Sequence, residues 1–444
     1  MFRRLSAAIR MDSLKGRLLR GGFAMLLIRI GGILAMLASS VVLARALGVE
    51  AFGVYSLAFS IMTLIAIPVH VGLPTLVLRE TASADLHGDL GLMKGIWLWS
   101  TRFVLVSSAV VVTGGLLLWL AVPGLVSAPL VVSFLLIPLI AFGGLRAAAL
   151  KGLRRIAWSM LPGSILRPGA LVVFVIAFLM IRPDGFGPVT AMWLHVAASV
   201  FAFAVGVWLV MLSQPAGLSE ASADKSKNRA WLAALGPMAL VGGLQIVNQN
   251  AGVVVLGAVD TEAEVGLFRV ALAASSMVLF GFQIVTPIFE PYFVRFHQST
   301  DKTGLQRMAT NSVLAGFLAI LPIVLVFVLG GEWLLAFLYG ADFRAAYPAL
   351  LVLLAGQIFR AYFGSSETIL MLTGQERQGM IIWGVAIALG LVLAVQLSQI
   401  YGAIGAAVAA SVVLILVRAV QWWVVLRKTG VDTALHAAFL RRVR

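Results

Sequence analysis

The feature that most constrains this chain is a series of apolar runs, each close to twenty residues long, separated by short polar segments. An α-helix needs about 20 apolar residues to cross the hydrocarbon of a bilayer. Charged residues make up 11% of the chain and hydrophobic residues 61%, whereas about one quarter of a soluble domain is charged. The runs therefore predict an all-α polytopic membrane protein.

Two groups of six runs indicate twelve spans. The first group lies at roughly 21–43, 51–73, 95–120, 128–149, 164–182 and 188–212, and the second at roughly 231–257, 265–289, 308–330, 347–370, 379–398 and 402–425. The first run is too long for a cleaved signal peptide. The predicted organisation is a basic N-terminal segment (1–20), an N-lobe (21–213), a hydrophilic linker (214–230), a C-lobe (231–426) and a basic tail (427–444).

The two groups of runs are internal repeats. Residues 41–58 overlay residues 254–271 at an offset of 213, with Gly53 matching Gly266, and the sequence from Phe186 echoes that from Tyr401. Six spans return a chain to its starting side, so the halves are parallel repeats. Their expected relation is a pseudo-twofold axis along the membrane normal, with a ligand site between them near mid-membrane.

Loop charges predict the orientation. With the N-terminus in the cytoplasm, that face carries twenty-four Lys and Arg residues, and the opposite face carries three, Arg45, Arg182 and Arg344. The positive-inside rule then places both termini in the cytoplasm. The net charge of +15 is thereby explained by topology, and the basic runs lack the interleaved aromatic residues of a nucleic-acid site.

The first hairpin and several later segments resemble a known family, the polysaccharide (O-antigen type) flippases of the multidrug/oligosaccharidyl-lipid/polysaccharide exporter superfamily. The resemblance covers the whole chain. It is carried by Leu43-Ala44-Arg45-x-Leu47-Gly48, Phe52-Gly53-x-Tyr55, Gly72-Leu73, Leu78-Arg79-Glu80, Pro291 and Tyr401-Gly402-Ala403-Ile404-Gly405-Ala406-Ala407. Where many relatives carry an Asp just before Gly72, this chain has His70-Val71.

The resemblance implies a transporter, not an enzyme, in the bacterial plasma (inner) membrane. It implies flipping of an undecaprenyl-diphosphate-linked oligosaccharide to the outer leaflet, by alternating access through a cationic cavity, for lipopolysaccharide, capsule or exopolysaccharide biosynthesis. No cofactor is implied, and a proton or sodium gradient with the membrane potential is the candidate driving force. The candidate partners are the lipid-linked glycan, the bilayer and the polysaccharide polymerase and chain-length machinery.

Ionisable residues inside spans are costly, so each needs a reason. The predicted spans embed an excess of positive charge, which suits an anionic ligand, and the planar fork of arginine suits a diphosphate. Glu367 is the clearly embedded acid. The embedded bases are Arg29, Arg102, Arg167, Arg269, Arg360 and Arg418.

Arg360 is the leading candidate because it lies roughly 20 Å into its span. Gln357, Arg360, Gly364 and Glu367 recur at helical spacing and predict one polar stripe on the tenth span. The alternative is an internal Arg360–Glu367 arrangement that only holds helices together. The same two readings apply to Arg29.

The other candidates carry a plainer alternative beside the functional one. Arg102 and Arg418 are close enough to span ends to snorkel into the interface, as is Arg269 near the outer mouth. Gln245 and Asn248 share one helix face and either bind sugar hydroxyls or join helices. Glu290, Glu367 and His70 are the ion-coupling candidates, and His70 and His195 also fit neutral packed imidazoles.

Two other function classes, a multidrug exporter and a membrane enzyme, are alternatives for a polytopic membrane protein. A multidrug exporter of the same superfamily would take cationic substrates, yet residues 21–212 hold no clearly embedded acid. A membrane enzyme of polysaccharide polymerisation or ligation would need a large outward loop, and the longest outward segment expected, roughly 331–346, is short. Phosphate-loop and HExxH motifs are absent, as is cysteine, so no metal site and no catalytic thiol is predicted.

Overall fold

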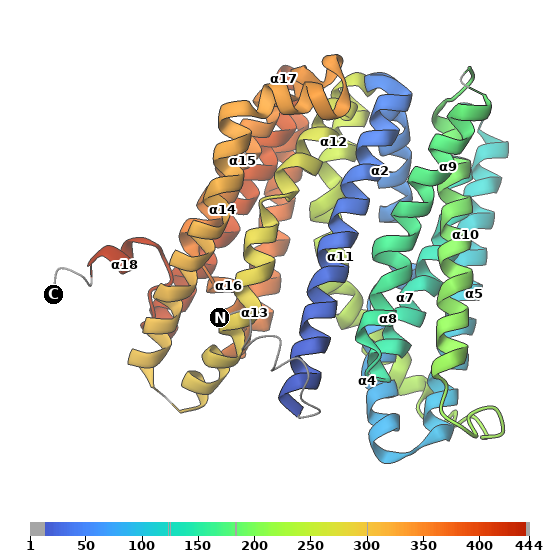
Figure 1. Cartoon of the computed structure of the whole chain (residues 1–444), viewed down its shortest axis with the longest axis vertical. Coiled ribbons are helices and arrows are strands. Elements are labelled where there is room, and N and C mark those ends of the chain that lie inside the picture. The colour runs from blue at the N-terminus through green and yellow to red at the C-terminus, as the bar shows by residue number, and fades with distance from the viewer. Residues whose placement is uncertain (1–13, 123, 125, 183, 300, 441–444) are drawn as a thin grey trace. The chain divides into compact units, whose positions relative to one another are not determined.

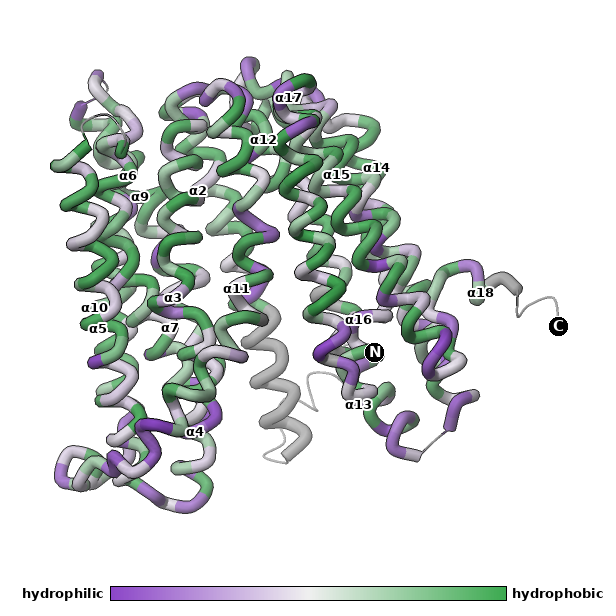
Figure 2. Tube along the Cα trace, turned by 180° about the vertical axis from the view of Figure 1, so that it is seen from behind, coloured by the Kyte–Doolittle hydropathy of each residue, from purple (hydrophilic) through white to green (hydrophobic). Residues whose placement is uncertain are grey.

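A computed structural model describes residues 14–440 except 123, 125, 183 and 300. Residues 1–13, most of the basic N-terminal segment, lie outside that range. Every regular element of the described part is a helix, and within it ten helical segments are long and apolar enough to cross a membrane (Figure 1). Hydrophobic residues dominate the lengths of these helices, and hydrophilic residues gather mainly at their ends (Figure 2). The chain is therefore a multi-pass membrane protein, as the runs predict.

The described residues form two compact units. Unit 1 comprises the chain up to Ala46 together with Ile61–Gly243. Besides the first arm of α2 (Leu14–Ile65) and the start of α11 (Asn228–Val259), its elements are α3 (Ile67–His70), α4 (Leu73–His87), α5 (Leu90–Ala121), α6 (Ala128–Ser133), α7 (Leu136–Gly152), α8 (Ile156–Leu161), the π-helical turn η1 (Pro162–Leu166), α9 (Arg167–Ile181) and α10 (Pro188–Ser213).

Unit 2 comprises Leu47–Ser60 and the chain from Leu244 onward. It holds the second arm of α2 and the rest of α11. Its other elements are α12 (Glu262–Ser276), α13 (Leu279–Gln298), α14 (Lys302–Tyr339), the 3₁₀-helix η2 (Ala341–Ala346), α15 (Tyr347–Phe363), α16 (Ser366–Leu372), α17 (Glu376–Thr429) and α18 (His436–Leu440). The segment 214–227 between α10 and α11 is not helical.

Two of the ten segments are interrupted by a glycine, which is how ten helices accommodate twelve predicted spans. α2 breaks at Gly48 (φ 76°, ψ 177°) and α17 at Gly402 (φ 54°, ψ −131°). Both φ values lie in the region that glycine adopts without a steric penalty. The second arm of α17 folds back on the first. Their backbones come so close there that a Cβ on Gly405 would collide with the backbone of Leu397. The carboxylate of Glu264 accepts the amide hydrogen of Ala403 at 2.7 Å and caps this second arm.

The predicted sequence repeat reappears as a local contact. A Cβ on Gly53 would collide with the carbonyl of Glu262, and a Cβ on Gly266 would collide with the carbonyl of Val49. At the offset of 213, Val49 corresponds to Glu262 and Gly53 to Gly266, so the two contacts are equivalent in the repeat. The contact is therefore reciprocal, as at a twofold crossing. Small residues let helices approach closely where lipid supplies no hydrophobic drive.

Loop charges at one end of unit 1 lie close together. Glu80 pairs with Arg79 at 2.9 Å and with Lys227 at 4.0 Å, and Asp85 pairs with Arg154 at 3.7 Å. The amide of Asp224 in the linker donates to the carbonyl of Gly91 at 3.0 Å. The helix α4, the linker and the turn at Arg154 thus share one end of unit 1. Which side of the membrane this end faces remains a prediction.

Several helices extend beyond the predicted spans. α14 continues to Tyr339, so most of the expected outward segment 331–346 is helical. The fifth span begins at Ile156, eight residues before the predicted 164, and Arg167 is the first residue of α9 within that span. The start of the tail is also ordered, because residues 431–435 pack on unit 2 through hydrogen bonds from Leu435 and Thr433.

The reciprocal glycine contact generates a prediction. Gly266→Ala introduces a methyl group against backbone atoms that have little freedom to move, and overpacking of this kind costs about 1–3 kcal/mol. We expect a lower unfolding temperature in detergent solution. Gly384→Ala is the matched control, because a Cβ there meets nothing within 4 Å and alanine favours the helix by up to about 1 kcal/mol. Equal unfolding temperatures of the two variants would contradict the close crossing.

Candidate functional site

The candidate site in unit 2 is built at a break in the tenth span. α15 ends at Phe363, Gly364 adopts φ 61° and ψ −141°, and the chain resumes as α16. The prediction of one continuous polar stripe is wrong in this respect, since Gln357 and Arg360 lie on α15 and Glu367 lies on α16. The break redirects the carboxylate of Glu367 toward α17.

Glu367 forms an ion pair with Arg418 and not with Arg360. Glu367 Oε2 lies 2.7 Å from Arg418 Nη1, and Glu367 Oε1 accepts a hydrogen bond from Trp383 Nε1 at 3.3 Å. Arg418 also donates to Gln421 Oε1 at 3.3 Å. Arg418 is 5% exposed, so it is buried in the unit and does not snorkel as predicted. Desolvated charges are tolerated only when such partners surround them.

Arg360 keeps its charge uncompensated. Its guanidinium lies 5.3 Å from the ring centre of Phe282, an attractive but weak contact between a cation and an aromatic face. No carboxylate of the described residues lies within ion-pair distance of it. Two arginines with one carboxylate leave the site a net charge of +1, and Arg360 interacts electrostatically with both Arg418 and Glu367.

Two buried polar atoms beside these charges have no hydrogen-bond partner among the described residues. They are Arg418 Nε and Gln357 Oε1. A buried group without a partner costs about 1–3 kcal/mol, which a bound polar ligand would recover. The site can therefore offer a donor from Arg418 and the fork of Arg360 to an acceptor-rich group, and the amide oxygen of Gln357 to a hydroxyl group.

The chain beyond α17 holds the break in place. The last carbonyls of α15 have no helical partner because the helix ends at Phe363. Thr433 Oγ1 donates to the carbonyl of Phe363 at 2.9 Å, and the amide of Leu435 donates to that of Tyr362 at 2.8 Å. Asp432 fixes this segment by accepting from Trp422 Nε1 at 2.8 Å. The segment that follows the twelfth span thus supports the geometry of the tenth.

The remaining candidates of unit 2 lie away from this cluster of contacts. Arg269 is half-buried in α12, where it interacts electrostatically with Tyr55 and Tyr339. Gln245 and Asn248 on α11 are exposed on the surface of the described residues, and so is Glu290 on α13. Their predicted roles in sugar binding and ion coupling stay predictions.

The candidates of unit 1 lie on four different helices. Arg29 is half-buried in α2, and Arg102 is exposed on α5. His70 ends α3, where its Nδ1 lies 2.8 Å from the carbonyl of Ala66. His195 is buried in α10, 7% exposed. Nothing in these positions assigns a role to either histidine beyond packing.

Sequence reasoning missed part of the site. Trp383 was not singled out because an indole in an apolar span is ordinary, and its bond to Glu367 depends on the break at Gly364. Gln421 carried a detectable signal, since it follows Arg418 by three residues and such pairs meet on a helix face. The pairing of Glu367 with Arg418, 51 residues later in the chain, left no local signal.

Comparison with solved structures defines the class of fold. An inward-facing multidrug resistance transporter of the MATE family in the MOP superfamily superposes with a TM-score of 0.73 at 14% identity, covering 92% of this chain and 98% of that one. The lipid II flippase MurJ in an inward closed conformation gives a TM-score of 0.66 at 14% identity, covering 95% of this chain and 91% of that one. This chain shares the fold of these two transporters.

The sequence comparisons narrow the class to a family. The model of the family described as polysaccharide biosynthesis protein matches residues 42–348. This chain belongs to that family. The probable low-salt glycan biosynthesis flippase Agl15 of Haloferax volcanii is 22% identical over 191 residues, which span 42% of this chain and 37% of that protein.

The ion pair at the break generates the second prediction. Arg418→Met leaves the carboxylate of Glu367 buried without its cation, and loss of one partner of a buried pair costs about 3–5 kcal/mol. The unfolding temperature of this variant in detergent should therefore be much lower than that of the unmodified chain. Arg418→Met combined with Glu367→Met should recover much of the loss, because it removes both charges.

The exposed pair of Arg344 and Glu332 provides the control. Their side chains are 60% and 54% exposed at a separation of 3.5 Å, and such surface pairs contribute at most about 1 kcal/mol. Arg344→Met should leave unfolding nearly unchanged. Equal effects of Arg344→Met and Arg418→Met on the unfolding temperature would show that the Arg418–Glu367 pair is not buried in the folded protein.

Proposed function

We propose that this chain flips an undecaprenyl-diphosphate-linked oligosaccharide from the cytoplasmic to the outer leaflet of the bacterial plasma membrane for surface polysaccharide biosynthesis. The observation that carries the proposal is the net positive site of Arg360, Arg418 and Glu367 in a helical membrane unit. Membership of the polysaccharide biosynthesis family supports the glycan, and the fold supports transport without catalysis.

Arginine chemistry matches the diphosphate. Arg360 offers a planar fork of donors that suits two phosphate oxygens and is balanced by no carboxylate of its own. Arg418 can add its unpartnered Nε–H. Arg29, Arg102 and Arg269 remain candidates for further contacts along the path, and Gln245, Asn248 and Gln357 for contacts with sugar hydroxyls.

Glu367 provides a route to ion coupling. Its carboxylate oxygen Oε2 forms an ion pair with Nη1 of Arg418 at 2.7 Å, so the carboxylate would compete with a phosphate oxygen for that donor. Proton binding to Glu367 removes the competing charge and raises the net charge of the site from +1 to +2. Binding of substrate and binding of a proton would then favour one another. Glu290 and His70 are the other candidates for a coupling ion.

Transport would proceed by rocking of two lobes. The pseudo-twofold relation expected from the sequence repeat is the arrangement that gives alternating access in related architectures. Outward movement of an anion from a negative interior releases about 2.3 kcal/mol per charge per 100 mV. A diphosphate therefore gains from the membrane potential, reduced by any positive charge that moves with it.

A multidrug exporter is the second candidate, favoured by the similarity to a multidrug resistance transporter of the same fold. Such a protein handles cations and needs carboxylates that face the substrate. Within the candidate spans up to Ser213 the acid is Glu50, which is exposed beside the break at Gly48. Glu367 is already neutralised by Arg418. The charge of the site therefore favours an anionic substrate.

A strain that lacks this gene tests the function directly. We expect lipid-linked oligosaccharide to accumulate in the membrane and polysaccharide to disappear from the surface, because the intermediate is made but not flipped. Both pools are measured by extraction and chromatography, and the trapped intermediate identifies the glycan. Unchanged pools together with new sensitivity to cationic dyes would contradict the flippase and favour the multidrug exporter.

The leading residue has its own test. Arg360→Gln removes a charged donor whose bond contributes about 1.5–3 kcal/mol, so flipping of a fluorescent polyprenyl-diphosphate oligosaccharide in liposomes should slow at least about tenfold. Unfolding temperature should change little. Arg182→Gln, an exposed arginine after α9, should flip at the unaltered rate. Full activity of Arg360→Gln would remove Arg360 from the site.

A further inference from the structure

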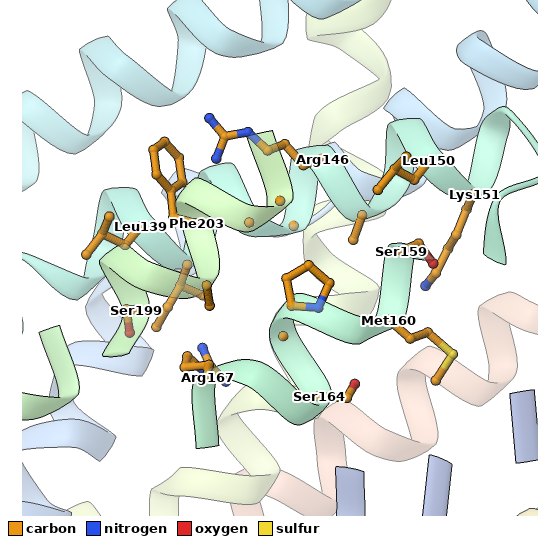
Figure 3. Close-up of a pocket in the computed structure, with 18 residues that line it drawn as sticks. Leu139, Arg146, Leu150, Lys151, Ser159, Met160, Ser164, Arg167, Ser199 and Phe203 are labelled. Carbon is orange, nitrogen blue, oxygen red and sulfur yellow. The ribbon is translucent and has the colours of Figure 1, made fainter. Parts of the chain in front are cut away.

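Unit 1 contains a separate cavity of about 350 Å³ where α7, the η1 turn and α10 meet (Figure 3). Its size falls in the range of small-molecule sites. Among the eighteen described residues that line it, three are basic and none is acidic. The basic residues are Arg146, Lys151 and Arg167.

Arg146 projects its guanidinium into an apolar setting. The guanidinium carbon lies 3.5 Å from the ring centre of Phe203, so one face of the planar group is stacked on the aromatic ring. Its Nη1 is buried and has no hydrogen-bond partner among the described residues. Stacking leaves the N–H groups at the edge of the plane available to an acceptor.

Ser199 adds a second unpartnered polar atom. It is 4% exposed, and its Oγ has no hydrogen-bond partner within the described part of the chain. Figure 3 shows Arg146, Ser199 and Arg167 on one side of the cavity and Lys151 with Ser159 on the other. A buried polar group without a partner is destabilising, so an acceptor between these side chains would be favourable.

The remaining lining is apolar. Leu139, Ile140, Leu150 and Met160 contribute side chains, and several glycines leave room between the helices. The π-helical turn at Pro162 contributes to this shape, because the amide of Arg167 bonds to the carbonyl of Pro162 five residues earlier. Single π-helical turns frequently occur at functional sites. The cavity thus combines cationic donors with hydrocarbon walls.

We propose that this cavity binds the phosphoryl group of an amphiphilic lipid. The phosphoryl group supplies acceptors and negative charge to arginine and lysine, and the alkyl chains of the lipid match the apolar walls. Basic pockets between membrane helices bind anionic lipid head groups in this manner. The proposal is independent of the transport function, because a phospholipid of the bilayer and a polyprenyl diphosphate share the required chemistry.

The test is native mass spectrometry of the full chain with defined lipids. Phosphatidylglycerol and undecaprenyl diphosphate are the phosphorylated probes, and diacylglycerol and undecaprenol are their counterparts without phosphate. We expect at least one phosphorylated lipid to be retained about tenfold better than its counterpart, because charge-assisted hydrogen bonds are the strong ones. Equal retention within both pairs would overturn the proposal.

Two variants locate the binding in the cavity. Gly143→Leu fills the cavity without changing any charge, since a Cβ at Gly143 meets nothing within 4 Å, and Arg146→Gln removes the stacked cation. Each should lower retention about tenfold. Gly169→Leu is the matched control, because its Cβ also meets nothing within 4 Å and Gly169 does not line the cavity. Unaltered retention in Gly143→Leu would overturn the assignment.

A competition experiment on the unmodified chain tests which chemical group is recognised, and it does not depend on whether a variant folds. Inorganic diphosphate added to the unmodified chain should displace the retained lipid if the phosphoryl group is the element recognised. Retention of phosphatidylglycerol would identify a lipid of the bilayer as the occupant, and retention of undecaprenyl diphosphate alone would identify a polyprenyl diphosphate as the occupant. Failure of diphosphate to compete with either lipid would overturn the proposal.

Discussion

The structure depends on one constraint: within hydrocarbon, every backbone amide and carbonyl must find its hydrogen bond inside the protein. Helices meet this requirement along their lengths, so the informative places are those where a helix stops. At Gly402 the carboxylate of Glu264 caps the new helix at Ala403. At Gly364 the segment after α17 supplies donors to the exposed carbonyls. Each of these two breaks is matched by a partner from elsewhere in unit 2.

The break at Gly364 also determines the electrostatics of the site. An unbroken helix would keep Glu367 on the stripe of Arg360, where the two charges would compensate one another. The break turns Glu367 toward Arg418, and Arg360 retains an uncompensated charge beside an aromatic ring. Structural ion pairing and ligand attraction are thus divided between two arginines. One carboxylate is enough to anchor the helices without neutralising the site.

Much of the fold could be predicted from residue pattern alone. Apolar length located the spans, and loop charges predicted which loops lie together, as the pairs of Glu80 with Arg79 and Lys227 illustrate. The correspondence of Gly53 with Gly266 followed from weak sequence similarity, and its meaning as a physical contact emerged only in three dimensions. The partner of Glu367 could not be predicted, because pairing across helices depends on a backbone break that apolar periodicity does not encode. Arg146 and Lys151, at the end of the predicted span 128–149 and just beyond it, line a cavity between helices that apolar length does not indicate.

The assignment of Leu47–Ser60 to unit 2 has a consequence for how the protein is made. This segment ends 202 residues before α12 begins, and it packs against α12 through Gly53 and Gly266. During synthesis it must therefore remain in the membrane without its native neighbour while the spans of unit 1 are inserted. The order of translation and the order of assembly differ here. The first hairpin of the chain is completed only when the second half arrives.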